Sequence, residues 1–437
     1  MDSYTLIFNI LNTILDVIKT WWWVLLPIIL WCPFLFFWLW WRRELWISKQ
    51  KFVFLELRIP KDVLRPIKAM EQVFCSLWGI LYGPPDPLEK WLDGEVSFSY
   101  SFEVASIGGK IHFYIKIPEA SRNAVEAAVY SQYPDAEITV TDDYTKNIPQ
   151  DIPNKDWDLY GADYQMIEKD IYPIKTYPKF FEEKPDIAKE EKRIDPISNL
   201  LEGMAKMKPG EQIWLQFICL PVANSEDNYV DRGKAVVNEI MKRTSKEKPS
   251  YKPILLEAFE GLFFGVREEG KKESASQLFE PDIMLSPGEK DTIKAIENKI
   301  SKPAFSATVR FLYLGKKNVF FKPQIQNIFS FFSQFSANNL NGFKPIAETK
   351  TKVKKIWFIP WNWLIPRRLY VRKRRIFRNY IKRVSPMFPR SGGTIILDAE
   401  EMTTLFHFPG RVVAPAPFIP RVESKRGEAP PELPVEE

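Results

Sequence analysis

The sequence has few of the residues on which most enzymes and metal centres rely. Its 437 residues include two histidines and three cysteines. Cys32, Cys75 and Cys219 lie far apart, so their spacing fits neither a disulfide framework nor a zinc site. Two histidines leave little for metal binding or acid–base catalysis. We therefore expect no metal, no cofactor and no disulfide, as in a reduced compartment.

No segment carries a usable nucleotide-binding or nucleophile motif. The nearest phosphate loop is GVREEGKK at 265–272, which places a lysine where a hydroxyl should hold Mg²⁺ and adds two glutamates that would repel phosphate. His112 lies in an alternating strand pattern and His407 follows an apolar helix, and neither belongs to a recognisable nucleophile elbow. We predict structural roles for both histidines, no catalytic residue and no enzymatic activity.

One long uncharged run lies near the amino terminus. Residues 20–41 carry no charge over 22 positions, which as a helix would reach roughly 33 Å and match a hydrocarbon core of about 30 Å. A cleavable signal peptide is the alternative, but the run is too long and no small-residue cleavage site follows. We predict a membrane-spanning helix over 20–43. Its interfacial residues would be Trp21, Trp22, Trp23, Trp38, Trp40, Trp41, Arg42 and Arg43.

The flanks of this run predict an orientation. Residues 1–19 place apolar side chains at helical spacing, which indicates an amphipathic helix at the membrane surface, with a helix-pairing face as the alternative. Basic residues are more frequent after the run than before it. By the positive-inside rule this predicts a single-pass protein of the cytoplasmic membrane with its C-terminal body in the cytoplasm.

The first part of the body predicts a ferredoxin-like domain over 50–145. Strand, helix, hairpin, helix and strand patterns follow one another, which is the order βαββαβ. Gly108 and Gly109 mark the hairpin turn, where glycine supplies positive φ. Residues 146–195 are rich in proline and charge and predict an extended connector.

The second part predicts another ferredoxin-like domain over 196–410, decorated by an insertion at 222–285. Two of its helices have amino-terminal signals: Ser286 is followed three residues on by Glu289, and the acidic end of TIILDAEE precedes an apolar helix. Residues 411–437 are acidic and proline-rich, which predicts a disordered tail. The fold class is therefore α+β, with a transmembrane helix and two ferredoxin-like domains.

A basic aromatic segment over 344–384 interrupts the second domain. Between Lys344 and Arg383, 14 Lys or Arg meet the single Glu348. We consider three interpretations. The segment could contact membrane lipid through Trp357, Trp361 and Trp363, or it could bind nucleic acid, with cations on phosphates and aromatic rings on bases. The third interpretation is a solvated basic helix. The candidate basic patch comprises Arg367, Arg368, Arg372, Lys373, Arg374, Arg375, Arg378, Lys382 and Arg383.

An ordered series of motifs over about residues 50–425 resembles a known family. The series is LRIPKDVLRPIKAMEQVFCSLWGI, SFEVASIGGKIHFYIKIP, VYSQYPDAEI, PIKTYPKFFE, DPISNLLEGMAKMKPGEQIWLQ, FSATVRFLYLG, FSQFSANNLNGF and LDAEEMTTLFHFP. It resembles the membrane-proximal N-terminal region, of unassigned function, of bacterial conjugation-type ATPases. These are the type IV secretion and coupling-protein relatives of HerA and FtsK-like motors.

The resemblance implies a role without catalysis. In that family the motor domain and its phosphate loop follow this region, and no such motif precedes Glu437 here. We therefore expect a non-enzymatic membrane protein, an accessory or scaffold of a type IV secretion or conjugation-like system. It would bind a separate motor ATPase or channel subunits through protein–protein interaction, and oligomers are compatible with this role. The alternative is a membrane-tethered nucleic-acid-binding protein that acts through 350–383.

Overall fold

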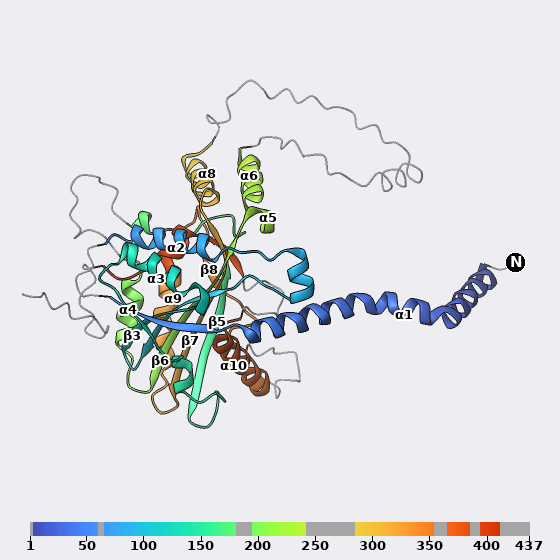
Figure 1. The fold of residues 1–437 in the computed structure, drawn as a ribbon, viewed down its shortest axis with the longest axis horizontal. Helices are drawn as coiled ribbons and strands as arrows, with labels where there is room; N and C mark the ends of the chain where they lie inside the picture. The colour runs from blue at the N-terminus through green and yellow to red at the C-terminus, as the bar shows by residue number, and fades with distance from the viewer. Residues whose placement is uncertain are drawn as a thin grey trace, which may run out of the picture. The chain divides into compact units, whose positions relative to one another are not determined.

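The structure, a computed structural model, describes residues 3–59, 65–180, 195–241, 285–353, 365–384 and 394–410 (Figure 1). The chain divides into two compact units. Unit 1 comprises Met1–Phe52, Tyr82–Phe98 and Pro118–Ala120, and unit 2 comprises Val53–Leu81, Ser99–Ile117 and Ser121–Glu437.

Unit 1 is built around the long helix α1 (Ser3–Lys49) and the short helix η1 (Glu89–Asp93). The indole N–H of Trp38 donates to the carbonyl of Trp91 over 3.1 Å. Gly94 follows η1 with φ of 74°, and a Cβ there would come within 2.3 Å of the backbone of α1. The two helices therefore approach closely only because this residue is glycine.

The predicted membrane-spanning helix requires a correction. Among the described residues, no helix combines the length and the apolar character that a membrane crossing needs. The structure thus contradicts the spanning helix over 20–43 and the single-pass location inferred from it.

Unit 2 contains a nine-stranded sheet with the order β4-β1-β3-β2-β6-β7-β5-β8, in which β9 also pairs with β7. The strands are β1 (Phe52–Arg58), β2 (Tyr100–Ile107), β3 (Lys110–Pro118), β4 (Glu137–Val140), β5 (Trp157–Met166), β6 (Glu211–Val222), β7 (Ala304–Lys316), β8 (Phe343–Pro345) and β9 (Ile395–Asp398). Gly108 and Gly109 form the turn between β2 and β3 with φ of 58° and 91°, which confirms the predicted hairpin turn.

The prediction of two ferredoxin-like domains is therefore wrong. The strands of the predicted first domain lie in the order β4-β1-β3-β2, but β2 also pairs with β6 from Tyr100 to Ile107. The β6 strand in turn pairs with β7 over twelve residues. An unpaired strand edge is a row of open donors and acceptors, and here β6 pairs with the edge of β2 that β3 leaves open. One continuous sheet results.

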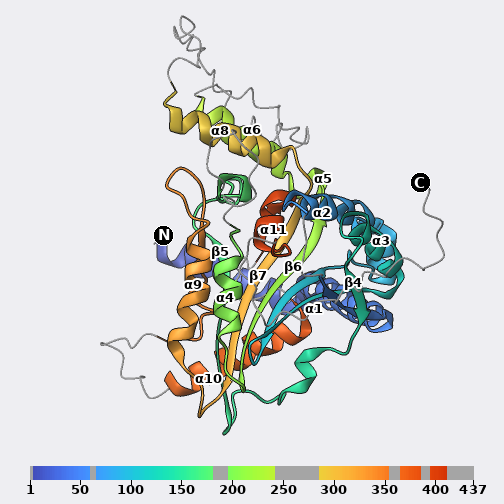
Figure 2. The same ribbon diagram turned by 90° about the vertical axis from the view of Figure 1, so that its left-hand side faces the viewer.

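Helices cover both faces of this sheet (Figure 2). One face carries α2, α11, α4 and α9, and the side chains that point to it include Phe102, Phe217, Phe305 and Phe311. The other face carries α10, and Trp214 and Leu312 point to it. The helices are α2 (Lys68–Leu81), η2 (Glu119–Ser121), α3 (Arg122–Gln132), η3 (Tyr144–Asn147), η4 (Tyr177–Phe180), α4 (Ser198–Ala205), α5 (Asn224–Asp227), α6 (Tyr229–Ile240), α8 (Pro287–Ile300), η7 (Lys322–Gln324), α9 (Ile325–Ser333), α10 (Ile365–Lys382) and α11 (Ala399–Leu405).

Two predicted helix starts are confirmed. Ser286 and Glu289 form a capping box on α8, and Asp398 and Glu401 form one on α11. In each box the first side chain accepts from the backbone N–H of the third helical residue, which satisfies a donor that the helix itself leaves open.

The segment predicted as an extended connector, 146–195, contains β5. This strand pairs with β7 along Trp157–Tyr164, and Asp163 near the end of this paired stretch is fully buried against Arg310. A buried charge makes the strand look polar in the sequence, because its partner lies 147 residues away. The predicted insertion and tail fall partly on 242–284 and 411–437, which lie outside the described residues.

Candidate nucleic-acid interface

The basic segment forms α10, which packs on the sheet along one stripe. Ile376, Phe377 and Tyr380 are buried and join a cluster that includes Trp214, Leu312 and other apolar residues of the sheet. The rings of Tyr380 and Trp214 lie 5.2 Å apart. Spacings of three and four residues bring these side chains to one side of a helix, so the opposite side faces away from the core.

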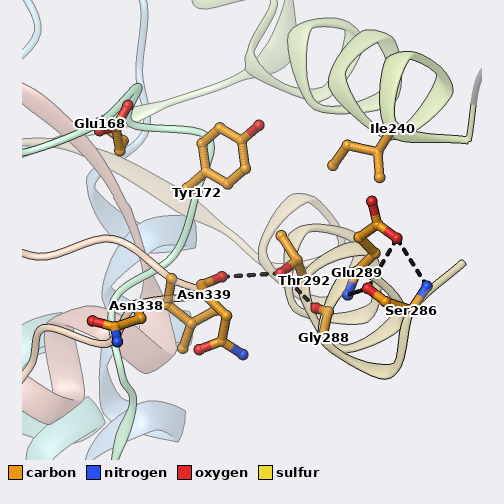
Figure 3. A pocket seen from close by; sticks show the side chains of 10 residues that line it. Glu168, Tyr172, Ile240, Ser286, Gly288, Glu289, Thr292, Asn338 and Asn339 are labelled. Carbon is orange, nitrogen blue, oxygen red and sulfur yellow. Dashed lines mark hydrogen bonds between the residues drawn. The ribbon is translucent and has the colours of Figure 1, made fainter.

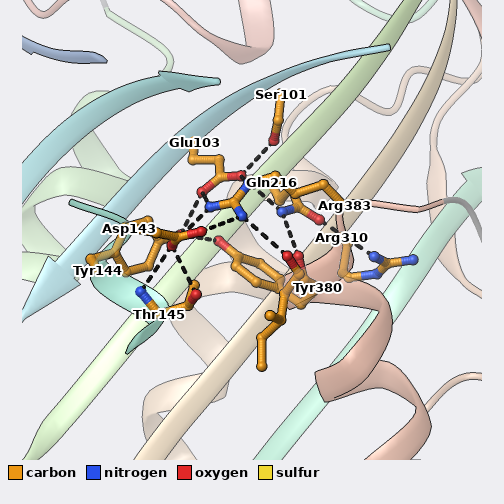
Figure 4. Close-up of polar contacts among 10 residues, drawn as sticks. Ser101, Glu103, Asp143, Tyr144, Thr145, Gln216, Arg310, Tyr380 and Arg383 are labelled. Carbon is orange, nitrogen blue, oxygen red and sulfur yellow. Dashed lines mark hydrogen bonds and ion pairs between the residues drawn. The ribbon is translucent and has the colours of Figure 1, made fainter. Parts of the chain in front are cut away.

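A buried polar network holds the carboxyl end of α10 (Figure 4). Arg383 follows the helix with φ of 55°, a conformation that glycine usually adopts at this position. Its Nε lies 2.7 Å from Glu103 Oε1 and its Nη1 lies 2.6 Å from Asp143 Oδ2. The Tyr380 and Tyr144 hydroxyls are 2.6 Å apart, and Tyr144 donates to Glu103.

The ionisation of this network follows from its burial. Burial alone would raise the pKa of Asp143, but the hydrogen bond and charge of Arg383 lower it below the ordinary value. Burial and the neighbouring Glu103 raise the pKa of Tyr144 well above the ordinary value, so its hydroxyl stays protonated and can donate. The guanidinium therefore contacts two carboxylates in the interior, and its single positive charge attracts both.

A second buried pair continues the network across the sheet. Arg310 on β7 and Asp163 on β5 are fully buried, with Nε and Oδ1 2.5 Å apart, and Arg310 also donates to the carbonyl of Val384 over 3.0 Å. Glu103 and Arg310 were not among the sequence candidates. A single charge inside an otherwise apolar strand is the signal that could have found them, because such charges are rarely buried without a partner.

Four of the nine predicted basic residues form hydrogen bonds or ion pairs with other parts of the protein. Arg383 belongs to the buried network, and Lys373 pairs with Asp158 at 2.5 Å. Arg372 donates to the carbonyl groups of residues 347, 350 and 352, and Arg374 donates to the carbonyl of residue 151 over 3.1 Å. These contacts fasten α10 to adjacent loops.

The other five point outward and define the basic face of α10. They are exposed and make no hydrogen bond or ion pair with any residue that the structure describes: Arg367, Arg368, Arg375, Arg378 and Lys382. At 100° per residue they occupy one sector of the helix, opposite Ile376 and Tyr380. From residue 367 to residue 382 the basic face extends about 22 Å along the axis.

The positive charges on α10 lie close enough together to shift the pKa of one of its arginines. Burial, the charge of Arg368 and the charge of Arg375 lower the pKa of Arg372, against the opposing effect of Glu348. Like charges at this spacing repel one another, so an anionic ligand would relieve the repulsion. Tyr370 and Val371 are each 45% exposed beside this charge.

The predicted interfacial residues of α1 belong to unit 1. Trp21, Trp40 and Trp41 are exposed, while Arg42 lies over the Trp38 ring at 5.9 Å and Arg43 is half-buried. The structure does not describe the side chains of Trp22 and Trp23. Three further predicted residues lie outside the described ranges altogether: Trp357, Trp361 and Trp363.

A pocket of about 580 Å³ lies at the amino end of α8 (Figure 3). Three of its polar side chains hold the start of α8. Glu289 accepts from the Ser286 backbone and hydroxyl at 2.8 and 2.9 Å. The Thr292 hydroxyl lies 2.8 and 2.9 Å from the carbonyl oxygens of Gly288 and Asn339. These contacts tie the first turn of α8 to a neighbouring loop.

Both histidines form hydrogen bonds within the protein. His112 Nδ1 lies 2.6 Å from Glu56 Oε1. His407 is buried, with Nδ1 2.8 Å from the Thr403 carbonyl and Nε2 2.8 Å from Asp195 Oδ1. Within the described residues, no group of three His, Cys, Asp or Glu side chains is arranged to hold a metal ion.

Asp195 should make the free energy of unfolding depend on pH in the acid range. Burial would raise its pKa, but the charge and hydrogen bond of His407, with backbone N–H donors, lower it below the ordinary value. Its contribution is therefore present above about pH 4 and lost as the pH falls through the folded-state pKa. We expect Asp195→Asn to lower the free energy of unfolding at about pH 6 by roughly 1.5–3 kcal/mol.

Urea unfolding between about pH 6 and pH 3 measures this effect. The difference between wild type and Asp195→Asn should shrink toward the acid end, because the wild-type carboxylate becomes protonated. Asp135→Asn, at an exposed carboxylate, is the matched control and should change little. A difference that stays constant over this pH range would contradict the role of the Asp195 charge.

Comparison with known proteins gives a family and no activity. No curated protein matches the sequence. The model of the family described as domain of unknown function DUF8128 matches residues 80–357, more than half of the chain. This match includes most strands of the sheet and ends before α10. The chain therefore belongs to the DUF8128 family of domains of unknown function.

Proposed function

We propose that this protein is a nucleic-acid-binding protein that contacts the phosphate backbone with the basic face of α10. The observation that carries the proposal is the division of the nine basic residues. Four fasten the helix, and Arg367, Arg368, Arg375, Arg378 and Lys382 remain exposed without an internal partner among the described residues.

The mounting of α10 supports this role. A helix that is buried along one stripe and held at its end by Arg383 presents its outer charges in a constant arrangement. Binding then requires little ordering of the backbone, so less of the attraction is lost. Phosphates lie about 3.4 Å apart along each strand of DNA, so the basic face, about 22 Å long, can follow several of them.

Reversing charge on the basic face should weaken nucleic-acid binding and its salt dependence. We expect the double variant Arg375→Glu/Arg378→Glu of the full chain to bind an oligonucleotide at least about tenfold more weakly at low salt. The slope of log affinity against log salt should fall by about 1.4 for a single strand, because two phosphate contacts are lost. Fluorescence anisotropy over a salt series measures both quantities.

Lys290→Glu/Lys294→Glu on α8 is the matched control. Both lysines are exposed, so this variant has the same change in net charge at a different place. Equal weakening by the two double variants would show that binding depends on net charge alone and would overturn the proposal. Absence of nucleic-acid binding, with binding to phosphatidylserine vesicles lost in the α10 variant, would favour a lipid surface instead.

A second candidate is an accessory role beside a motor ATPase. The motifs that resemble conjugation-type ATPases support it, because they lie in order along β2, β3, β6, β7 and α11 of one sheet domain. The role would be non-enzymatic, through protein–protein contacts with the motor or with channel subunits of a type IV secretion-like system. Co-elution of the full chain with a motor ATPase encoded beside it would support this candidate. Failure to co-elute would count against it without affecting the first.

A further inference from the structure

An open groove lies beside the amino-terminal half of α10. It has a volume of about 450 Å³ and is bounded by α10, α9 and the edge of β5. Leu159 and Tyr160 both line it, although neighbouring residues of a strand point to opposite faces. The groove therefore wraps around the sheet edge, and its size is within the range of ligand pockets, about 300–1,000 Å³.

Aromatic rings form much of its wall. Tyr160, Phe320 and Phe329 line it, and all three are partly exposed. Tyr313 stacks on Phe320 with ring centroids 4.7 Å apart, and Phe311 and Tyr160 hold Phe329 through edge contacts at 5.9 and 6.5 Å. The rings are thus supported from behind, which keeps them in place for a flat apolar guest.

The charge around the groove is positive. Lys322 and Lys352 are exposed at its border, and none of the described residues that line it is acidic. Lys350 Nζ lies 5.2 Å from the centre of the Phe329 ring. Lys373 also lines the groove but is paired with Asp158. A guest with an apolar ring and an anionic backbone complements this arrangement.

The same helix carries both the groove wall and the basic face. Ile365, Leu369 and Lys373 line the groove at intervals of four residues, on the side of α10 that also carries the buried Ile376 and Tyr380. Of the basic face, Arg368 lies nearest to this side, because it follows Ile365 by three residues. A strand that enters the groove therefore meets the basic face at Arg368, and the exposed Lys322 and Lys352 lie at the border of the groove for its other phosphates.

We propose that the groove takes an unpaired nucleobase, so that the ligand of the basic face is a single strand. This inference rests on the proposed function and names its substrate class. In a duplex the bases are stacked and paired inside the helix, whereas single strands expose rings that stack on aromatic side chains regardless of sequence. The phosphates stay outside on α10, and the base enters between Phe320, Phe329 and Leu369.

Binding of three probes to the full chain tests this inference. They are an oligothymidylate of about 15 nucleotides, an abasic strand of the same length and a duplex of the same length. Wild type should prefer the oligothymidylate to both other probes. Phe329→Leu and Phe320→Leu should each weaken binding of the oligothymidylate by about fivefold or more and leave binding of the abasic strand unchanged, since that strand has no base to insert.

Phe321→Leu is the matched control, because Phe321 is 57% exposed and does not line the groove. It should bind all three probes as wild type does. Equal binding of the oligothymidylate and the abasic strand by wild type, or equal loss in Phe321→Leu, would overturn the groove as a base site. If Arg375→Glu/Arg378→Glu still weakened all probes in that case, the proposed function would stand without this inference. If wild type bound no probe, both would fail.

Discussion

Replacing Arg383 with methionine should lower the free energy of unfolding by about 3–5 kcal/mol. The guanidinium contacts Glu103 and Asp143, and its side chain is only 4% exposed. Methionine fills similar space but removes the cation that both carboxylates contact directly. The cost arises from these orphaned charges, since removing one partner of a buried ion pair costs more than the pair itself contributes.

Urea unfolding monitored by tryptophan fluorescence measures the change, because Trp214 lies in the same buried cluster. Arg378→Met, on the exposed side of α10, is the control and should stay within about 0.5 kcal/mol of wild type. Adding Glu103→Gln to Arg383→Met should recover part of the loss, because it removes one orphaned charge and keeps an acceptor for Tyr144. Equal effects of the Arg383 and Arg378 changes would show that the network does not stabilise the fold.

Replacing Lys299 with methionine should have a comparable effect at the other end of the sheet. Lys299 is 2% exposed, and its Nζ lies 2.8 Å from Glu401 Oε2 and 2.9 Å from the Ile396 carbonyl. Burial and the charge of Glu401 raise the pKa of the adjacent Asp398 well above the ordinary value, and Lys299 opposes this rise. Without the ammonium, two buried acids have lost their nearest cation, so we expect a loss of about 3–5 kcal/mol.

Lys294→Met on the exposed side of α8 is the control for this change, with an expected effect within about 0.5 kcal/mol. The double variant Lys299→Met/Glu401→Gln should be more stable than Lys299→Met. Its glutamine can still accept the backbone N–H of Ile174, which lies 2.9 Å from Glu401 Oε1. If the double variant were the less stable of the two, the loss would come from packing and not from charge.

The sequence predicted which segment carries the candidate site, but not which of its basic residues face outward. Nine basic residues between 367 and 383 look equivalent in the sequence, and the structure divides them into four that fasten α10 and five that face outward. A signal for part of this division was present. Ile376 and Tyr380 mark the buried stripe, and Arg383 continues it at helical spacing. The groove was not predictable, since its aromatic residues come from β5, α9 and the segment after β7.

The fold was predictable at the level of elements and not of their assembly. The hairpin turn at Gly108 and Gly109 and the caps at Ser286 and Asp398 were correctly predicted. The two separate domains were not correct, because an alternating strand specifies which side chains share a face and leaves open which strand pairs along each edge. The predicted spanning helix over 20–43 was also contradicted, because no helix among the described residues combines the length and the apolar character that a membrane crossing needs.

The sequence by itself determined the local features of this protein: the helix and strand periods, the glycine turn, the capping boxes and the excess of positive charge after Lys344. Each depends on residues at most a few positions apart, so a short window contains the whole interaction. Only the tertiary structure decided which charges are buried and which face outward. Arg310 meets a partner 147 residues away and Arg383 one 280 residues away, and such pairs form only when the sheet brings β2, β5, β7 and α10 together.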